Sequence, residues 1–318
     1  MPQPADQREM RAVYCETLMA LAHENENIMV LNADLESAHG LKPFSAAFPG
    51  RSLDVGVAEA NMVGIAAGLS ACGKLPVVHS FSTFATRRCY DQIALAVCYS
   101  GLNVKIVGSD PGVGAELNGG THMGVEDVAI MRALPRMSVV EPADAAQLAA
   151  ALPAIFAHDG PVYIRMLRKA VPPVSGKNSA FCLGRADRLR AGTDATVIAS
   201  GRCVAESLRA AESLAEHGLS VEVINMHTIK PLDREAVLDA ACRTGALVTA
   251  ENHSIIGGLG SAVAETLAEN HPTPLARVGI QDRFGEVGKT DDLLRVFGIA
   301  AQHIAEAVLK VLRLKESL

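Results

Sequence analysis

Residues 75–108 read LPVVHSFSTFATRRCYDQIALAVCYSGLNVKIVG. A short apolar run at 75–79 is followed by a stretch of helical period at 86–98, and then by a second apolar run at 104–108. Short apolar runs bounded by turn residues are typical of buried strands, and a helix between two of them typically joins parallel strands. This stretch therefore predicts a strand–helix–strand unit.

The same alternation extends in both directions through the first half of the chain. Further strands are expected at 28–32, 137–140 and 162–165, and further helices at 9–23, 60–71, 124–133 and 143–157. Strands that alternate with helices in this way predict an α/β fold with mainly parallel sheets.

The segment 169–192 interrupts this rhythm with Pro172 and Pro173, and it is predicted to be a linker. A second alternation follows. It comprises expected strands at 195–200, 221–225 and 246–251, and expected helices at 203–217, from Pro231 through Cys242, and at 262–270. We therefore expect two α/β domains, residues 1–186 and residues 187–318.

The composition, 49% hydrophobic and 20% charged, is that of an ordinary soluble globular protein. A formal net charge of -6 gives no electrostatic footprint for nucleic acid or an anionic membrane. No apolar run reaches the ~18 residues that a membrane span needs. The polar start of the sequence has no signal-peptide core, so a cytoplasmic location is expected.

The seven cysteines include no CxxC pair and no Cys/His cluster at metal-ligand spacing. We expect them to be reduced and mostly buried, and we expect no metal site in this chain. They stand at positions 15, 72, 89, 98, 182, 203 and 242.

One acid stands where an extended segment meets a helix of small residues. Residues 54–68 read DVGVAEANMVGIAAG, with Glu59 at the junction. The small residues should let this helix pack closely against another backbone, which would bury Glu59. Burial raises the pKa of a carboxyl group that lacks a partner, and a raised pKa suits proton sharing with a ring nitrogen. A helix N-terminal glutamate favoured by the helix dipole is the alternative.

Two of the eight phenylalanines, Phe81 and Phe84, follow the apolar run 75–79. Parallel sheets bind ligands beyond the carboxyl ends of their strands. Aromatic rings in such a place can stack on a flat heterocycle, although two core phenylalanines are an equal alternative.

A glycine-rich loop, GSDPGVGAELNGGTHMG at 108–124, follows the next expected strand. Such loops commonly carry binding residues, and no GK[ST] follows that would make a P-loop. His122 could orient or protonate a hydroxyl group at neutral pH, unless it is simply solvated.

Arg165 and Arg168 close the run that begins at 162, where guanidinium groups could bind a phosphate bidentately or simply face solvent. The segment 251–261, ENHSIIGGLGS, lacks the GxGxxG spacing of a nucleotide site. It is predicted to be a tight turn that packs against the first domain or a partner.

The order and spacing of these features resemble the transketolases. The resemblance runs from about Arg11 to Leu312 and is closest to the separately encoded C-terminal subunits of split transketolases. The pyrimidine-binding domain is matched by DLES at 34–37, VGVAEANM at 55–62, SFSTF at 80–84 and GGTH at 119–122, and the C-terminal domain by IKPLD at 229–233 and by residues 251–261.

The resemblance implies thiamine diphosphate as the cofactor. Glu59 corresponds to the glutamate that hydrogen-bonds the aminopyrimidine ring and promotes its imino tautomer. Phe84 corresponds to the aromatic residue that stacks on this ring, and Phe81 lines the same pocket.

The resemblance also implies a substrate site. His122 corresponds to a histidine that contacts substrate hydroxyl groups. Arg168, together with Arg11 and Ser37, corresponds to groups that hold the phosphate of the sugar.

Two departures from the family pattern concern the substrate. Asn118 stands where transketolases usually have the Asp of a GEDG-type loop, and Ser109-Asp110-Pro111 stands where many have a histidine. The usual Asp binds a hydroxyl group near the ketose C2–C3 bond, and a neutral amide lacks its charge-assisted hydrogen bond. We therefore expect a non-standard ketose phosphate, such as apulose 4-phosphate.

The Gly-Asp-Gly motif with which the family holds its metal is absent from the sequence. Because Mg²⁺ needs oxygen ligands beside the diphosphate, we expect an N-terminal partner subunit to hold both. The expected assembly is a heterotetramer with two copies of each subunit.

Two alternatives remain open. One is the beta subunit of a 2-oxoacid dehydrogenase E1 component, against which the GGTH loop, the paired arginines and the Phe81/Phe84 spacing argue. The other is a non-catalytic scaffold subunit, which has no need of an acid at Glu59.

Overall fold

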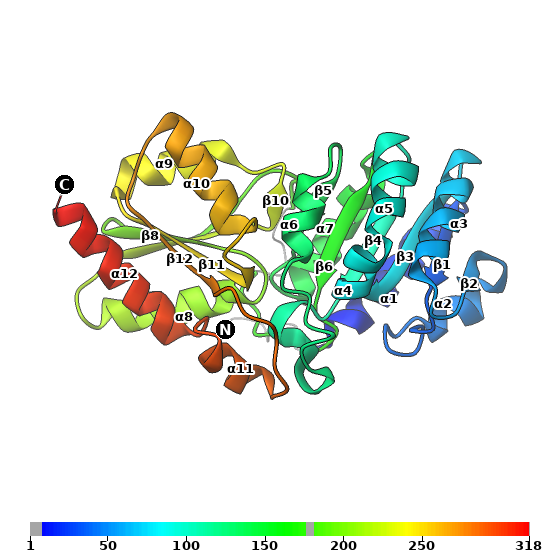
Figure 1. Cartoon of the computed structure of the whole chain (residues 1–318), viewed down its shortest axis with the longest axis horizontal. Helices are drawn as coiled ribbons and strands as arrows, with labels where there is room; N and C mark the ends of the chain where they lie inside the picture. The colour runs from blue at the N-terminus through cyan, green and yellow to red at the C-terminus, as the bar shows by residue number, and fades with distance from the viewer. Residues whose placement is uncertain (1–7, 176–180, 318) are drawn as a thin grey trace.

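The computed structural model describes residues 8–175 and 181–317 of the chain. It contains two sheets that lie side by side, the first mainly from the blue-to-green half of the chain and the second from the half that ends in red (Figure 1). Neighbouring strands are parallel except at β10 and β7, which confirms the predicted α/β class with mainly parallel sheets.

The first sheet has seven strands in the order β10-β5-β6-β4-β3-β1-β2. They are β1 (Ile28–Asn32), β2 (Ser52–Asp54), β3 (Leu75–Phe81), β4 (Lys105–Ser109), β5 (Ser138–Val140), β6 (Val162–Met166) and β10 (Thr228–Lys230). β10 pairs antiparallel with β5, so the second half of the chain supplies an edge strand to the first sheet.

Helices cover both faces of this sheet (Figure 1). α1 (Met10–Glu24) and α7 (Ala145–Ala157) pack on one face, and α3 (Glu59–Ala71) and α6 (Asp127–Ala133) on the other. A parallel sheet covered on both faces has near-continuous apolar strands. Every residue of β3 and β4 is accordingly buried, which is why the apolar runs at 75–79 and 104–108 predict these strands so clearly. The short helix α2 (Lys42–Ala47) precedes β2.

The single helix expected at 86–98 is wrong. The chain instead forms α4 (Ser82–Thr86), a 3-10 turn at Arg87–Cys89, α5 (Tyr90–Gln92) and a π-helix at Ile93–Tyr99. The regular helix is interrupted where Thr86 (φ -121°, ψ -77°) and Cys89 (φ -124°, ψ 23°) leave helical geometry. A helical period in the sequence does not distinguish these helix types.

The second sheet has five strands in the order β12-β11-β8-β9-β7. They are β7 (Asp187–Arg190), β8 (Ala195–Ala199), β9 (Val221–Asn225), β11 (Leu247–Ser254) and β12 (Leu275–Ile280). On one side lie α8 (Cys203–Ala215) and α12 (Ala301–Glu316), and on the other α9 (Arg234–Thr244) and α10 (Leu259–Asn270) (Figure 1). α11 (Thr290–Val296) precedes α12.

The predicted linker at 169–192 is wrong at its end, because β7 pairs antiparallel with β9. As an edge strand of polar and partly exposed residues, β7 lacks the apolar pattern of a buried strand. The domain boundary between residues 186 and 187 stays a prediction.

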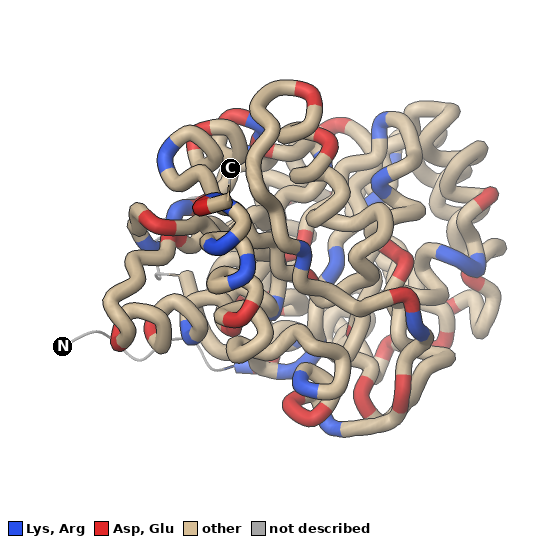
Figure 2. Tube along the Cα trace, turned by 60° about the vertical axis from the view of Figure 1, so that its left-hand side comes forward, with Lys and Arg blue, Asp and Glu red and all other residues tan. Residues whose placement is uncertain are grey.

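Basic and acidic residues are interspersed along the trace rather than gathered by sign (Figure 2). In the described part of the chain, no helix has the length and apolar character needed to cross a membrane. All seven cysteines are free. Four are buried, while Cys72, Cys182 and Cys242 are exposed.

Candidate active site

The site lies where three neighbouring strands end. Phe81 of β3 pairs with Ser109 of β4, which pairs with Met166 of β6. This register brings Phe81, Asp110 and Arg168 to one edge of the sheet, where parallel sheets bind ligands.

Glu59 begins α3 and is buried, with 1% of its surface exposed. Its carboxylate accepts hydrogen bonds from Ser80 Oγ at 3.1 Å and from Arg88 Nη1 at 2.9 and 2.8 Å. A buried carboxylate is costly unless it is paired, and Arg88 provides the compensating charge.

The expected close packing along α3 is not found within the described chain. A Cβ atom built on Gly64 or Gly68 would meet nothing within 4 Å. Ser80 and Arg88 bond the buried Glu59 carboxylate at the start of the helix.

Phe81, Phe84 and His122 meet in edge-to-face contacts. The ring centroids lie 6.1 Å apart for Phe81–Phe84, 5.3 Å for Phe81–His122 and 5.1 Å for Phe84–His122. The Arg88 guanidinium carbon lies 3.9 Å from the centroid of the Phe84 ring. The guanidinium therefore bonds Glu59 and covers an aromatic ring at the same time.

These contacts test whether the site fits an aminopyrimidine. Such a ring needs an aromatic face to stack on and a carboxylate to accept its N–H hydrogen bond. Arg88, which is also planar and also an N–H donor, already uses Phe84 and Glu59 in this way. The residues present therefore fit the aminopyrimidine of thiamine diphosphate. For a metal, residues 8–175 and 181–317 contain no group of three or more His, Cys, Asp or Glu side chains that could act as ligands.

Arg168 lies beside Phe81, with its guanidinium carbon 4.9 Å from that ring centroid. Its backbone N–H donates to Asp110 Oδ1 at 3.0 Å, and its Nε donates to Asp110 Oδ2. Burial raises the pKa of the Asp110 carboxyl group, and the charge of Arg168 opposes that rise. A carboxylate therefore holds the predicted anion-binding arginine in place.

Arg11 adjoins Arg168 through the backbone, because its N–H donates to Arg168 O at 3.1 Å. Its side chain donates to Ala38 O at 3.1 Å and to Glu9 Oε2 at 2.7 Å. Ser37, next to Ala38, is exposed. Arg11 therefore lies beside the predicted anion site.

Asn118 is exposed, and its side-chain amide donates to Ala115 O at 3.0 Å, within its own turn. Its amide nitrogen thus braces the turn, and a role toward substrate stays a prediction.

Two buried histidines lie beneath the site. His39 Nε2 lies 3.0 Å from Ser109 Oγ, and His79 Nε2 lies 2.7 Å from Tyr14 Oη. Burial lowers the pKa of His39 to about 4 and that of His79 to about 3, so both are neutral at physiological pH.

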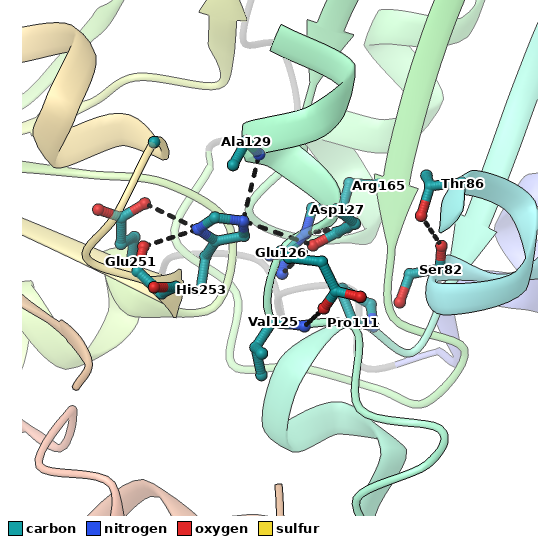
Figure 3. Close-up of polar contacts among 12 residues, drawn as sticks. Ser82, Thr86, Pro111, Val125, Glu126, Asp127, Ala129, Arg165, Glu251 and His253 are labelled. Carbon is teal, nitrogen blue, oxygen red and sulfur yellow. Dashed lines mark hydrogen bonds and ion pairs between the residues drawn. The ribbon is translucent and has the colours of Figure 1, made fainter. Parts of the chain in front are cut away.

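Neither of the two possibilities raised for Arg165, phosphate binding or exposure to solvent, holds. Arg165 is fully buried, and its guanidinium donates to Asp127 Oδ2 at 2.8 Å, Glu141 Oε1 at 2.5 Å and Asn252 O at 2.7 Å (Figure 3 shows Arg165 and Asp127). Asn252 belongs to β11 of the second sheet. Arg165 therefore joins the two halves of the chain.

The segment 251–261 packs against the first half, as predicted. His253 Nε2 accepts a hydrogen bond from Ala129 N at 3.3 Å, and Ser254 N donates to Val125 O at 2.8 Å (Figure 3 shows His253, Ala129 and Val125). Burial raises the pKa of Glu251 to about 7 and lowers that of His253 to about 4.

Comparison with known proteins identifies both halves. Residues 6–173 match the family described as "Transketolase, pyrimidine binding domain", and residues 184–304 match "Transketolase, C-terminal domain". The chain belongs to the transketolase family. Membership implies thiamine diphosphate as the cofactor and supports the transketolase reading over the dehydrogenase alternative.

Several relatives are separate transketolase subunits of similar length. The chain is 57% identical to the 6-deoxy-6-sulfo-D-fructose transketolase subunit SqwH of Clostridium sp. (strain MSTE9), with 95% of this chain and 94% of the relative covered. It is 36% identical to one of the apulose-4-phosphate transketolase subunits of Phocaeicola vulgatus, with 95% and 97% covered. A solved structure described as "Split gene transketolase, inactive beta4 tetramer" matches with a TM-score of 0.90 and 43% identity over 97% of this chain and 99% of that one.

Three residues that bond site residues of this transketolase subunit were not predicted from the sequence: Ser80, Arg88 and Asp110. The contact of Arg88 with Phe84 had no helical signal, because the regular helix is interrupted at Thr86 between them. The pairing of Asp110 with Arg168 had no local signal, since 58 residues separate them.

Proposed function

We propose that this transketolase subunit serves the transfer of a two-carbon ketol unit from a ketose with a terminal anionic group to an aldose acceptor. One continuous set of contacts carries the proposal. Glu59 and Phe84 share Arg88, Phe84 meets Phe81, and Phe81 meets Arg168. A carboxylate for a heterocycle and a guanidinium group for an anion thus flank one aromatic wall.

Thiamine diphosphate, when bound, supplies a nucleophilic thiazolium carbon and an electron sink. In the proposal, Glu59 accepts the ring N–H and holds a proton there, while Phe84 and Phe81 stack on and enclose the ring. His122 Nδ1 lies 3.0 Å from Thr121 Oγ1, which leaves Nε2 to bond a substrate hydroxyl group.

An N-terminal subunit holds the diphosphate and Mg²⁺ in this proposal, within a complex of two copies of each subunit. Support comes from the missing Gly-Asp-Gly motif. The solved split-gene relative, whose beta chains form a tetramer described as inactive, is consistent with it. A cytoplasmic location remains a prediction.

For the donor we propose 6-deoxy-6-sulfo-D-fructose, the sugar in the name of the relative at 57% identity. Sulfonate and phosphate both offer oxygen acceptors to a guanidinium group such as that of Arg168. Apulose 4-phosphate, from the name of the relative at 36% identity, is the second candidate.

The test combines the chain with a candidate N-terminal subunit, thiamine diphosphate and Mg²⁺. The mixture receives 6-deoxy-6-sulfo-D-fructose, apulose 4-phosphate or xylulose 5-phosphate together with an aldose acceptor, and ketol transfer is measured by mass spectrometry. We expect the sulfonated ketose to have the highest kcat/KM. Equal or better cleavage of xylulose 5-phosphate would refute the proposed donor.

A calorimetric titration tests the division of labour between subunits. Thiamine diphosphate with Mg²⁺ should bind tightly to the mixed complex and weakly to this chain alone. Equally tight binding by the isolated chain would show that it holds the diphosphate itself.

A further inference from the structure

The arginines at the predicted anion site are already paired with acids of the same chain. Arg168 pairs with Asp110, and Arg11 pairs with Glu9. Two positive charges thus meet two negative charges before any substrate arrives. The Asp110 side chain is only 5% exposed, so solvent screens its charge weakly.

The geometry leaves Arg168 able to bind an anion while Asp110 stays beside it. Asp110 takes the backbone N–H and the Nε of Arg168. Within the described residues, no hydrogen bond engages the two terminal nitrogens of this guanidinium. An anion bound by those nitrogens would therefore lie near a fixed carboxylate.

Neither Lys169 nor His39 supplies spare positive charge. Lys169 pairs with Glu116, which also adds a negative charge near Asp110. His39, which faces both Arg11 and Arg168, is neutral at physiological pH because burial lowers its pKa to about 4.

A cavity of about 450 Å³ adjoins Asp110. Its charged lining residues include Arg202, Lys289 and Asp291, and the Arg202 guanidinium is itself paired with Asp291.

We propose that Asp110 makes this site select a terminal group with one negative charge, such as a sulfonate, over a phosphate with two. The inference rests on the proposed function and concerns the same site. A sulfonate carries one charge throughout the usual pH range, whereas a phosphate monoester carries close to two above its second pKa of about 6. The second charge of a phosphate bound by Arg168 meets the repulsion of the buried Asp110 carboxylate, which is already bonded to the same guanidinium group.

The first experiment needs no variant. In the mixed complex with thiamine diphosphate and Mg²⁺, kcat/KM is measured for 6-deoxy-6-sulfo-D-fructose and for D-fructose 6-phosphate. A second pKa of about 6 makes the phosphate about 1% monoanionic at pH ~8 and about three-quarters monoanionic at pH ~5.5. The ratio of the two kcat/KM values cancels any pH dependence that both reactions share.

The ratio of kcat/KM for the sulfonate to kcat/KM for the phosphate should exceed one at the higher pH. It should fall by about tenfold at the lower pH, because protonation of the phosphate and protonation of Asp110 each reduce the repulsion. A ratio that stays constant with pH, or that favours the phosphate at pH ~8, would overturn the proposal.

Asp110→Asn provides the second experiment. Asp110 has a positive φ of 48°, a conformation that asparagine tolerates well, and the amide oxygen can still accept the Arg168 backbone N–H. At pH ~8 the variant should lower the sulfonate-to-phosphate ratio by about tenfold. The control, Glu126→Gln, removes a carboxylate that pairs with Arg87 instead, and should change the ratio much less.

An equal loss with both ketoses in Asp110→Asn would make Asp110 a positioning residue for Arg168 without a role in charge selection. If the wild-type complex splits neither ketose, the proposed function fails and this inference fails with it. Activity on both ketoses with an unmoved ratio refutes the charge selection alone.

Discussion

Arg88 Nη1 lies 2.9 and 2.8 Å from the two carboxylate oxygens of Glu59, while its guanidinium carbon lies 3.9 Å from the centroid of the Phe84 ring. The chain thus places a cation of its own against the carboxylate and the ring assigned to the aminopyrimidine. Since 44% of its side chain is exposed, Arg88 has room to move aside. Binding of the cofactor ring must break this contact.

Arg88→Ala should therefore raise the affinity of the mixed complex for thiamine diphosphate. The pair is partly exposed and screened, so an ion pair and a cation–π contact of about 0.5–1 kcal/mol each predict a gain of roughly five- to thirtyfold. Calorimetric titration measures it. Arg87→Ala, which loses a pair with Glu126 instead, is the control. Weaker binding by Arg88→Ala would show that Arg88 supports the ring.

Glu59→Ala should abolish the activity of the mixed complex and leave its assembly intact. Loss of a group that accepts and holds a proton typically costs about 10²–10⁴-fold in rate. Ketol transfer and size-exclusion chromatography measure the two properties, with Glu126→Ala as a control at a more exposed acid paired with Arg87. Failure to assemble would instead assign Glu59 a structural role, and unchanged activity would favour the non-catalytic scaffold.

Arg165→Met should destabilise the chain strongly. It leaves the buried carboxylates of Asp127 and Glu141 without their cation, and breaking a buried pair costs about 3–5 kcal/mol. The midpoint of urea unfolding should fall accordingly. In Arg295→Met, which loses an exposed pair with Asp292, the cost should stay below about 1 kcal/mol. Equal midpoints in the two variants would contradict the role of Arg165 in joining the halves.

Acid should destabilise the chain through four buried histidines. Burial lowers the pKa of His39, His227 and His253 to about 4 and that of His79 to about 3. The unfolded chain takes up these protons near pH ~6.5, so stability is lost as the pH falls from there toward 4. Glu251, with a pKa raised to about 7, acts in the opposite direction, as do Asp110 and Asp187, whose pKa values burial also raises.

The urea midpoint should consequently be lower at pH ~5 than at pH ~7.5. His79→Gln should reduce this difference, whereas His271→Gln, at an exposed position, provides the control. A higher midpoint at the lower pH would contradict the prediction.

The strands that the sequence predicts best are those covered on both faces. β1 occupies residues 28–32 as expected, because a buried parallel strand must be apolar along its whole length. β7 and β10 are edge strands of four and three residues, and their pairing depends on partners far along the chain. No local pattern reveals such a strand.

The site residues were likewise predictable where the sequence carries a local motif, and not where the role depends on a partner from elsewhere in the chain. The order of motifs along the chain predicted Glu59, Phe81, Phe84 and His122 as site residues. The three rings among them meet beyond the end of β3. Arg165 and Arg168 look alike in the sequence, yet one is buried in the strand and the other lies beyond its end. Their difference is set by Asp127, Glu141 and Asp110, which the fold brings from elsewhere.

β10 carries a consequence for how this chain can be divided or recombined. Although it lies between β9 and α9 in sequence, it completes the edge of the first sheet beside β5. Lys230 at its end also donates to Arg132 O at 2.9 Å. A gene cut near residue 187 would leave β5 as a bare edge, which invites aggregation. The two halves are therefore not interchangeable modules, and any exchange of the second half between relatives must bring a compatible β10 with it.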